Sequence, residues 1–538
     1  MMARTADSPA ALGFYLHVDD PETHGLAPNE VGDALLRAIT DRASHDDAAA
    51  AVLDVIPAYD SLYVEFDASM VEEARMRRFV EGAIAGRSRE RDGGGAEPAT
   101  RPASGAGAPG RPRLVTIPVT YGGEHGIDLG AVAAHVGLSP EAVIELHAGA
   151  TYRVAAVGFA PGFPFLAEVP TPIRVPRHAA PRTLVPAHSV AIANQQTGIY
   201  PLASPGGWNV IGRSLVAVYD PHREEPFLLA PGDEVRFEAA AGTPPPEPTP
   251  LELLPPSPRL PRLRVEAPGL LDLVLDAGRF LTGRFGLARS GPLDAPLARL
   301  ANRLVANPPD APLLEMTLTG PTFEAVVDTV VAVTGDALVP VVDGDAREPY
   351  AGFMVRRGQR LSFAPARRGC RSYLALGGGI DAATFLGSVS ADLRGRIGRP
   401  LAAGDVLGAA RERRVVPGRA FVPHRPSRDP EIIRLLPGPQ ADSEATRALT
   451  DQPFEVGRAD RTGMHLVGPE VPGGEITSEA APLGAVQVTR AGAPIVLLHD
   501  RGTLGGYAKP ALVHPADLAR LAQVRVGARV RFVMTGSR

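Results

Sequence analysis

Two reactive residue types are almost missing from this chain of 538 residues. It has one cysteine and, among its 55 basic residues, one lysine, Lys509, so the other 54 are arginine. A lone lysine at that position leaves no Gly-x-x-x-x-Gly-Lys-Ser/Thr phosphate loop, no Met-Lys-Met-type biotin site and no lysine in the glycine-rich-loop arrangement of a protein kinase. A lone cysteine, Cys370, excludes an internal disulfide and a multi-cysteine metal cluster.

Basic runs with interleaved aromatic residues, long apolar runs and a basic leader are lacking as well. The formal net charge is -5, and no stretch has the basic character that nucleic-acid binding needs. No apolar run approaches the roughly 18 residues that cross a bilayer, and Met1 to Asp20 does not resemble a signal peptide. We therefore expect no nucleic-acid partner, no membrane segment and a cytoplasmic location.

Glycine and proline, in contrast, are abundant, with 58 and 55 residues. Both interrupt helices, so the chain is expected to form many turns and short strands. The hydrophobic fraction of 44% is enough for sizeable cores. At about 150 residues per domain, the length favours three to four domains.

The first 86 residues alternate between strand and helix patterns. Strands are predicted over 12–18 and 52–66, and helices over 29–41 and 70–84, the second behind a Ser69-x-x-Glu72 capping box. This order predicts a small α+β sandwich. A polar, Gly- and Pro-rich linker is predicted over 87–112, and a Pro-rich one over 241–261. Elsewhere short strands dominate, with one helix predicted over 141–148 behind Ser139-Pro140.

The densest group of glycine and polar residues spans 158–213. Arginines here offer bidentate donors for a carboxylate or a phosphate, and the only tryptophan, Trp208, lies among them. The candidate binding residues are Arg177, Arg182, Gln195, Gln196, Thr197, Tyr200, Trp208 and Arg213. The alternative is that these segments are barrel turns, with the aromatic residues in a core.

A second group spans 268–320, where residues of both charges alternate with glycine. Asp276, Arg279, Ser290, Asp294 and Glu315 are compatible with a magnesium-phosphate site or an acid–base site. Short polar residues beside glycine also form ordinary turns, so the spacing does not decide between the two interpretations.

The third group lies near the C-terminus and includes Glu479, Asp500, Tyr507 and Lys509. The excess of arginine resembles a coding bias that replaces lysine wherever arginine serves, so a surviving lysine is more often needed as a compact ammonium. Lys509 follows a Gly-Gly turn that lets the backbone approach a ligand closely. The alternative is a chance survivor on the surface. The thirteen histidines show no metal-ligand spacing, and no metal site is predicted.

Longer motifs resemble a known family over nearly the whole chain. Residues 11–240 resemble the B subunit of 5-oxoprolinase, also called allophanate hydrolase subunit 1 or a Kip-type kinase inhibitor, and residues 262–534 resemble its C subunit, the corresponding subunit 2 or Kip antagonist. The motifs of the first part are Gly158-Phe-Ala-Pro-Gly-Phe-Pro-Phe-Leu166, Pro181-Arg182-x-x-Val-Pro186, Gln196-Thr-Gly-Ile-Tyr-Pro201 and Gly206-Gly-Trp208. Those of the second part are Asp276-x-Gly-Arg279, Ser290-Gly-x-x-Asp294, Gly377-Gly-Gly-Ile-Asp381 and Asp500-x-x-Thr-x-Gly-Gly-Tyr-x-Lys509. The chain departs from the family pattern at Leu275, at Gly502 and over 461–466.

The resemblance implies a mainly β fold with an α+β part: a ferredoxin-like N-terminal domain followed by cyclophilin-like β-barrels. The expected domains are a ferredoxin-like unit over 1–86, a barrel over 113–240, and in the second part of the chain one barrel over 262–425 and another over 426–538. The implied reaction is ATP-dependent opening of 5-oxo-L-proline to L-glutamate together with a separate A subunit of 5-oxoprolinase. ATP and Mg²⁺ are the implied cofactors, and a homo-oligomeric assembly is left open.

The chemistry of that reaction suggests roles for the candidate residues. Phosphorylating the lactam oxygen needs cations around phosphate, and the later attack of water needs a general base. As a hypothesis, Arg177, Arg182, Arg213 and Lys509 hold a carboxylate or phosphate, and Asp276, Asp294, Asp500 or Glu479 serve as base or metal ligand. Two alternatives stay open: a biotin-dependent carboxyltransferase component acting on urea-like amides, and a Kip-type regulator that binds a histidine kinase.

Overall fold

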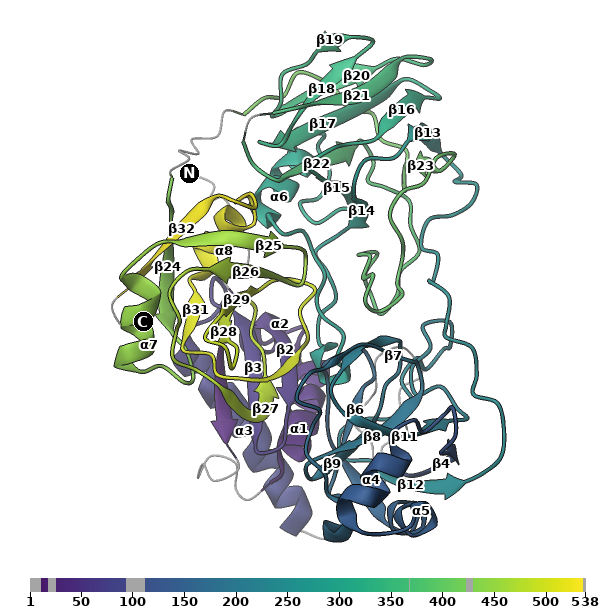
Figure 1. Cartoon of the computed structure of the whole chain (residues 1–538). Coiled ribbons are helices and arrows are strands. Elements are labelled where there is room, and N and C mark those ends of the chain that lie inside the picture. The colour runs from purple at the N-terminus through teal and green to yellow at the C-terminus, as the bar shows by residue number, and fades with distance from the viewer. Residues whose placement is uncertain (1–10, 18–25, 93–111, 367, 422–428, 536–538) are drawn as a thin grey trace.

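The computed structural model describes residues 11–17, 26–92, 112–366, 368–421 and 429–535. Within them the chain forms a small α+β unit, a closed barrel, a body of two sheets and a second closed barrel (Figure 1). In Figure 1 the two-sheet body lies at the top and the barrels lie below it, with the purple N-terminal unit behind the second barrel. The prediction of a mainly β fold with few helices and with barrels is confirmed.

The N-terminal unit is a three-stranded sheet packed against helices. Its elements are β1 (Ala11–His17), α1 (Pro28–Arg42), α2 (Asp47–Ala51), β2 (Val52–Pro57), β3 (Ser61–Asp67) and α3 (Glu73–Asp92). The order is β1-β3-β2, and β3 runs antiparallel to both neighbours. This is the split β-α-β arrangement of a ferredoxin-like fold, whose sheet has a fourth strand. The described residues of this unit contain three strands, so the ferredoxin-like prediction is not confirmed as a whole.

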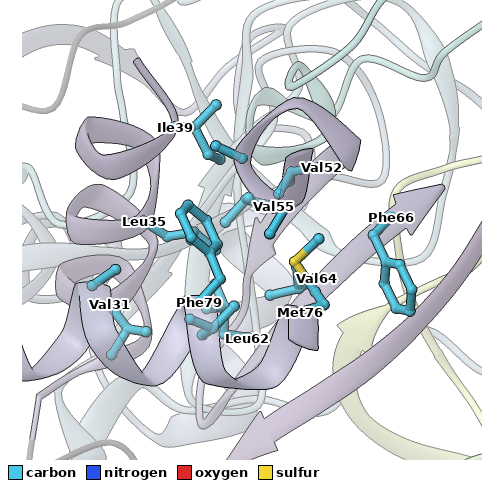
Figure 2. Packing of buried hydrophobic residues seen from close by; sticks show 14 of the residues in the cluster. Val31, Leu35, Ile39, Val52, Val55, Leu62, Val64, Phe66, Met76 and Phe79 are labelled. Carbon is cyan, nitrogen blue, oxygen red and sulfur yellow. The ribbon is translucent and has the colours of Figure 1, made fainter. Parts of the chain in front are cut away.

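The core of this unit follows from the spacing of its apolar residues. Val31, Leu35 and Ile39 recur every four residues and so line one side of α1. Figure 2 shows these side chains meeting residues of both β2 and β3 and Met76 and Phe79 of α3. Burial of this apolar surface, rather than intrinsic helix propensity, therefore holds the two long helices on the sheet.

Two boundaries in this unit differ from the prediction. The second long helix begins at Glu73 rather than at residue 70, because Ser69 turns back and donates its N–H and its hydroxyl to Asp67 at 2.9 and 2.6 Å. The Ser69 side chain is therefore hydrogen-bonded within a turn and does not cap the helix. The helix also continues to Asp92, so the first residues of the predicted linker 87–112 are helical, and residues 93–111 lie outside the described part.

The first barrel closes with seven strands. They are β4 (Leu114–Tyr121), β5 (Thr151–Val157), β6 (Pro164–Ala167), β8 (Ser189–Ala193), β9 (Gln196–Ile199), β11 (Asn209–Ser214) and β12 (Glu234–Ala239). Helices α4 (Leu129–Val136) and α5 (Pro140–Ala148) pack on it, and β7 (Arg182–Val185) pairs with β10 (Ser204–Gly206) as a separate ribbon. Helix α5 begins with Pro140 at its first position, as predicted, and Ser139 caps it by accepting the Ala142 N–H at 3.2 Å.

The predicted barrel over 262–425 is instead a body of two open sheets. One sheet has the order β19-β18-β21-β16-β13-β23 and the other β14-β15-β22-β17-β20. The strands are β13 (Pro261–Ala267), β14 (Asp272–Leu275), β15 (Leu313–Thr317), β16 (Thr322–Ala325), β17 (Thr329–Gly335), β18 (Leu338–Val342), β19 (Asp345–Ala346), β20 (Ala351–Val355), β21 (Arg360–Pro365), β22 (Arg371–Leu376) and β23 (Val406–Gly408). Strand spacing alone could not separate a barrel from a sandwich, because both alternate short strands and turns. Helix α6 (Ala295–Leu304) packs on β17 and β22.

The second barrel again closes with seven strands. They are β24 (Glu431–Pro437), β25 (Phe454–Ala459), β26 (Gly463–Val467), β28 (Ala485–Val488), β29 (Pro494–Leu497), β31 (Ala511–Val513) and β32 (Arg529–Met534). Helices α7 (Ser443–Thr450) and α8 (Pro515–Leu521) accompany it, and β27 (Glu475–Ala480) pairs with β30 (Leu504–Tyr507) as a ribbon.

No single helix among the described residues is long and apolar enough to cross a membrane. Helices α4 and α5 meet that test only when taken together, across a bend of 95°. Their buried side chains Leu129, Val132 and Val143 belong to the core of the first barrel.

Candidate functional site

The only lysine is completely buried beside the ribbon of the second barrel. The Nζ of Lys509 lies 2.8 Å from Glu479 Oε1 and 3.4 Å from the carbonyl oxygen of Tyr507. Gln440 touches both charged residues: its Nε2 donates to Glu479 Oε1 at 2.8 Å, and its Oε1 accepts the Lys509 N–H at 2.9 Å. The structure thus brings together three predicted residues and adds Gln440, which the sequence analysis did not identify.

The surroundings of Lys509 suit an ammonium with one donor to spare. Burial lowers the pKa of Lys509, and Glu479 opposes that change. Two protein acceptors face the ammonium, which has three N–H donors, so one donor has no protein acceptor. The arrangement can shift a proton between Lys509 and Glu479, and because Lys509 is fully buried an oxyanion could reach the third donor only after a local opening of the structure.

Asp500 lies in a second buried cluster, centred on Arg461. Arg461 donates from Nε to one Asp500 oxygen at 2.8 Å and from Nη2 to the other at 3.1 Å. Its Nη1 pairs with Glu315 of β15, and Nη2 also donates to the carbonyl oxygens of Ser290 and Gly291. Burial raises the pKa of Asp500, and Arg461 counteracts this. Arg461 therefore joins the second barrel to the two-sheet body. Both oxygens of Asp500 accept hydrogen bonds from this arginine, so the carboxylate has a structural partner.

Asp276 and Arg279 are held by the loop that carries Ser388 and Ser390. The Asp276 carboxylate accepts both serine hydroxyls, Ser390 at 2.7 Å, and the Val389 N–H at 3.0 Å. Arg279 is 1% exposed and donates to the carbonyl oxygens of Phe385 and Ser390. Both predicted site residues thus fix one loop against another, as the turn interpretation expected.

Asp294 and Ser290 likewise have structural partners. Asp294 is the N-cap of α6, where it accepts the Leu297 N–H at 3.2 Å, and its second oxygen accepts Nε2 of Gln523 at 3.0 Å. Ser290 has a positive φ of 57° and donates its hydroxyl to Asp392 at 3.1 Å. These residues shape the turn that leads into α6.

A cavity of about 40 Å³ lies between this turn, the start of α6 and the end of β29. Asp276, Arg289, Arg299 and His499 line it with apolar residues of α6. Arg289 Nε and His499 Nδ1 are buried and have no hydrogen-bond partner. Burial, followed by nearby arginines, holds the pKa of His499 well below its usual value, so its ring is neutral. An unpaired guanidinium N–H and an unpaired ring nitrogen beside a small, mainly apolar cavity are groups that can bind an anion or a polar amide.

The three candidate arginines of the first barrel do not meet Lys509. Arg182 donates to both oxygens of Asp128, at 2.8 and 2.6 Å, and also lies 2.9 Å from His178 Nε2. Arg213 donates to the Ala187 carbonyl oxygen from Nε and Nη2. Arg177 is exposed. No hydrogen bond or ion pair of these described side chains reaches Lys509, so the predicted four-cation cluster is not assembled in the structure.

The remaining candidates of the first barrel divide between its surface and its interior. Gln195 is exposed and Gln196 half-buried at the hairpin that joins β8 to β9. Thr197 is fully buried, donates to the Ala191 carbonyl oxygen and lies 2.9 Å from His147 Nε2. Burial lowers the pKa of His147 to about 3. Thr197 therefore belongs to a closed polar network in the barrel core.

Tyr200 and Trp208 belong to an aromatic cluster between the barrels. Phe163 lies edge-on to both, with ring centroids 5.1 and 5.5 Å away. The same apolar cluster includes Ala480 and Leu504 from the ribbon of the second barrel. Burial raises the pKa of Tyr200 to about 12. These two residues form part of the contact between the barrels, as the alternative core interpretation expected.

Comparison with known proteins identifies the two halves of the chain. The model of the carboxyltransferase domain, subdomain C and D, matches residues 26–229, and that of subdomain A and B matches residues 285–534. The C subunit of 5-oxoprolinase from Escherichia coli strain K12 is 34% identical over 282 residues, which cover 50% of this chain and 90% of that protein. The chain belongs to the carboxyltransferase-domain family of 5-oxoprolinase subunits. The prediction that its two parts resemble the B and C subunits is confirmed.

Other similar proteins cover from about a quarter to nearly all of the chain. The B subunit of 5-oxoprolinase from Escherichia coli O157:H7 is 55% identical over 125 residues, 23% of this chain and 57% of that protein. The chain thus spans little more than half the length of that relative. Urea amidolyase of Lachancea kluyveri is 32% identical over 50% of this chain and 17% of its own. The crystal structure of TTHA0988 is 52% identical, covers 97% of this chain and 100% of its own, and has a TM-score of 0.86.

Proposed function

We propose that this chain is the B–C component of an ATP-dependent 5-oxoprolinase, which hydrolyses 5-oxo-L-proline to L-glutamate together with a separate A subunit. One observation carries the proposal: the two halves of a single chain resemble proteins named as the B and the C subunits of 5-oxoprolinase. Lettered subunits belong to an assembly of several chains, and this chain unites two of them.

The C-terminal half offers two candidate sites for such a reaction, the Lys509–Glu479 pair and the cavity lined by Arg289 and His499. A lactam becomes a good electrophile once its oxygen is phosphorylated, and the negative charge that develops needs nearby cations. Lys509 offers one free N–H donor next to Glu479, which suits an oxyanion and a proton transfer. The cavity offers Arg289 and the neutral ring of His499, which suit the carboxylate and the amide of a small substrate.

A site for ATP with Mg²⁺ is implied by the resemblance to 5-oxoprolinase. Among the described residues, no group of three or more His, Cys, Asp or Glu side chains could hold a metal ion. Asp276, Asp294 and Asp500 are each held by fixed N–H or O–H donors in separate turns or ion pairs. We propose that the nucleotide binds on the A subunit, which is a different chain, and derive no step through the nucleotide on this one.

The test is reconstitution of the purified chain with the A subunit of a 5-oxoprolinase. The measured quantity is ATP hydrolysis stimulated by 5-oxoproline, with glutamate as product. Replacing Lys509 with Met should lower kcat about 10²-fold, the loss seen when one donor to a developing oxyanion is removed. Arg458→Met, at an exposed position of the same barrel, should leave the rate unchanged. Wild-type rates in the Lys509 variant would remove this residue from the site, and absence of any stimulation by 5-oxoproline would refute the function.

The urea amidolyase relative supports a second candidate, a carboxyltransferase that acts on urea-like amides. Such a reaction needs carboxylated biotin, which is carried on a lysine. The only lysine here is fully buried and paired, so the carrier would have to be another chain. Carboxylation of urea in the presence of a biotin carrier, without any response to 5-oxoproline, would favour this candidate. Capture of a histidine kinase in place of the A subunit would favour the regulatory alternative.

A further inference from the structure

The two closed barrels follow the same path strand by strand. In each, the first and last strands pair in parallel and the other neighbours pair antiparallel. In barrel order, β4, β12, β5, β6, β9, β8 and β11 correspond to β24, β32, β25, β26, β29, β28 and β31. The ribbon of β7 and β10 corresponds to the ribbon of β27 and β30, because each ribbon strand falls between equivalent barrel strands. Positions in one barrel therefore have counterparts in the other.

The surroundings of Lys509 have such a counterpart. In the second barrel the Gln440 N–H donates to the Lys509 carbonyl oxygen at 3.4 Å, and the Lys509 N–H donates to Gln440 Oε1 at 2.9 Å. In the first barrel the Asp128 N–H donates to the Val210 carbonyl oxygen at 2.9 Å, and the Val210 N–H donates to Asp128 Oδ2 at 2.7 Å. The same reciprocal pair of hydrogen bonds equates Gln440 with Asp128 and Lys509 with Val210.

The ribbon supplies a third equivalent position. The Gly-Gly pair before Lys509, predicted as a turn, lies within strand β30, and in the first barrel Gly206 likewise ends strand β10. The ribbon residue that pairs with the first glycine of each Gly-Gly pair is Arg182 in the first barrel and Glu479 in the second. Each of these two residues contacts the equivalent side chain of its own barrel. Arg182 donates to Asp128, and Glu479 accepts from Gln440 at 2.8 Å. The three positions hold Asp, Arg and Val in one barrel and Gln, Glu and Lys in the other, so the formal charges differ position by position while each set sums to zero.

We propose that Gln440 is a positioning residue for the Lys509–Glu479 pair. Its amide fixes one Glu479 oxygen and the Lys509 backbone at the same time, and so sets where the ammonium points. This inference rests on the proposed function, in which Lys509 meets an oxyanion. The neutral amide of Gln440 is one of three differences from the first barrel, where the same position carries the carboxylate of Asp128.

The charge exchange explains why the position holds an amide. Asp128 tolerates a negative charge because its ribbon partner is an arginine at 2.6 Å. At Gln440 the ribbon partner is a carboxylate, and two carboxylates at hydrogen-bond distance repel each other strongly in a buried place. Gln is therefore the residue that can donate to Glu479 and still accept from the Lys509 backbone.

Few charged groups act on this pair. Among the described residues, Glu479 is the charged group that faces Lys509. Glu479 also acts on Tyr15, whose hydroxyl donates to the Ala480 carbonyl oxygen at 2.7 Å and whose pKa is raised by burial and then by Glu479. Arg501 acts on Tyr15 in the opposite direction. A change of charge at Gln440 should therefore shift the pKa of Lys509, because few other charged groups act on Lys509.

The single lysine makes the test direct. Protein grown on lysine labelled with ¹³C at Cε and ¹⁵N at Nζ carries one labelled side chain, so NMR follows the titration of Lys509 alone in the full-length chain. With wild-type protein we expect a midpoint below the ordinary lysine value of 10.5. Gln440→Glu should raise the midpoint by about one unit or more, because it adds a carboxylate beside the ammonium. Gln440→Met, of similar size, should not raise it.

A double variant provides the matched rescue. Gln440→Glu combined with Glu479→Gln exchanges the amide and the carboxylate, restores the net charge and should return the midpoint toward the wild-type value. With the A subunit present, Gln440→Met should lower kcat/KM about tenfold, as the loss of one charge-assisted hydrogen bond implies. Equal midpoints in wild type and Gln440→Glu, or no return in the double variant, would overturn the proposal. The NMR readout needs no substrate, so it stands or falls independently of the 5-oxoprolinase assignment.

Discussion

Replacing Arg461 with Met tests whether the second barrel is tied to the two-sheet body by charge. Arg461 is 5% exposed, and its guanidinium pairs with Asp500 and Glu315, of which Glu315 belongs to β15 of the two-sheet body. Methionine matches the length of the side chain but leaves both carboxylates in a buried place without their cation. Removing one partner of a buried ion pair typically costs about 3–5 kcal/mol.

This cost converts to a large change in thermal unfolding. At about 2–4 °C per kcal/mol for units of 150–250 residues, the midpoint should fall by on the order of 10 °C. The assay is calorimetry of wild type, Arg461→Met and Arg458→Met. Arg458 lies on the exposed face of the same barrel, where it contacts His465, so its variant controls for the loss of a guanidinium as such.

The dependence of the loss on pH supplies the stricter test. Burial already raises the pKa of Asp500, and Arg461 counteracts this, so the pKa should rise further in the variant. A folded-state pKa above the unfolded value of about 4 means that the penalty is full at neutral pH and disappears as the pH falls toward 4. The gap between wild type and Arg461→Met should therefore narrow from pH 7.5 to pH 5. A gap no larger than that of Arg458→Met, or one that widens at pH 5, would refute the reasoning.

Two further predictions concern the first barrel. Burial lowers the pKa of His147 to about 3, so below pH 6.5 the unfolded chain binds a proton that the folded chain does not. The free energy of unfolding should therefore fall by about 1.4 kcal/mol for each unit by which the pH is lowered between 6.5 and 3. Denaturant titrations at a series of pH values should show a weaker dependence of this free energy on pH in His147→Gln. In Gly206→Ala, the new Cβ would lie 2.3 Å from the Tyr200 hydroxyl oxygen, so the packing of the aromatic cluster should be disturbed. The fluorescence emission of Trp208, the only tryptophan, should then shift to the red. Gly130→Ala is the control, because nothing lies within 4 Å of its Cβ, and it should leave the emission unchanged.

Local patterns in the sequence predicted the secondary structure and the family, because each depends on residues close together in the chain. The Ser139-Pro140 start of α5 and the apolar spacing of α1 are local signals of this kind. The failure at Ser69 has the same origin: two short-range hydrogen-bonding options compete there, and the side chain of Asp67 attracts Ser69 before the helix can.

The partners of the candidate residues could not be predicted in the same way. Lys509 stood out by its rarity, but Gln440 lies 69 residues before it and resembles any other glutamine until the barrel closes. Arg461 lies in a segment whose only sequence signal is its departure from the family pattern, and its partner Glu315 is 146 residues away. An arginine-rich chain gives no signal for which guanidinium will be buried, because burial is decided by packing between separate domains.

The Pro-rich segment 241–261 is not what holds the two halves of the chain together. The N-terminal unit is bound to the C-terminal half by hydrogen bonds from the Gly283 N–H to Asp54 and from the Leu281 N–H to the Leu53 carbonyl oxygen. Asp54 is buried, and burial followed by Glu65 raises its pKa to about 7. The segment itself pairs with the two-sheet body through a bridge from Leu251 to Ile397. The resemblance implies two subunits joined by a linker, but buried contacts such as that between Gly283 and Asp54 pack the two halves directly against each other.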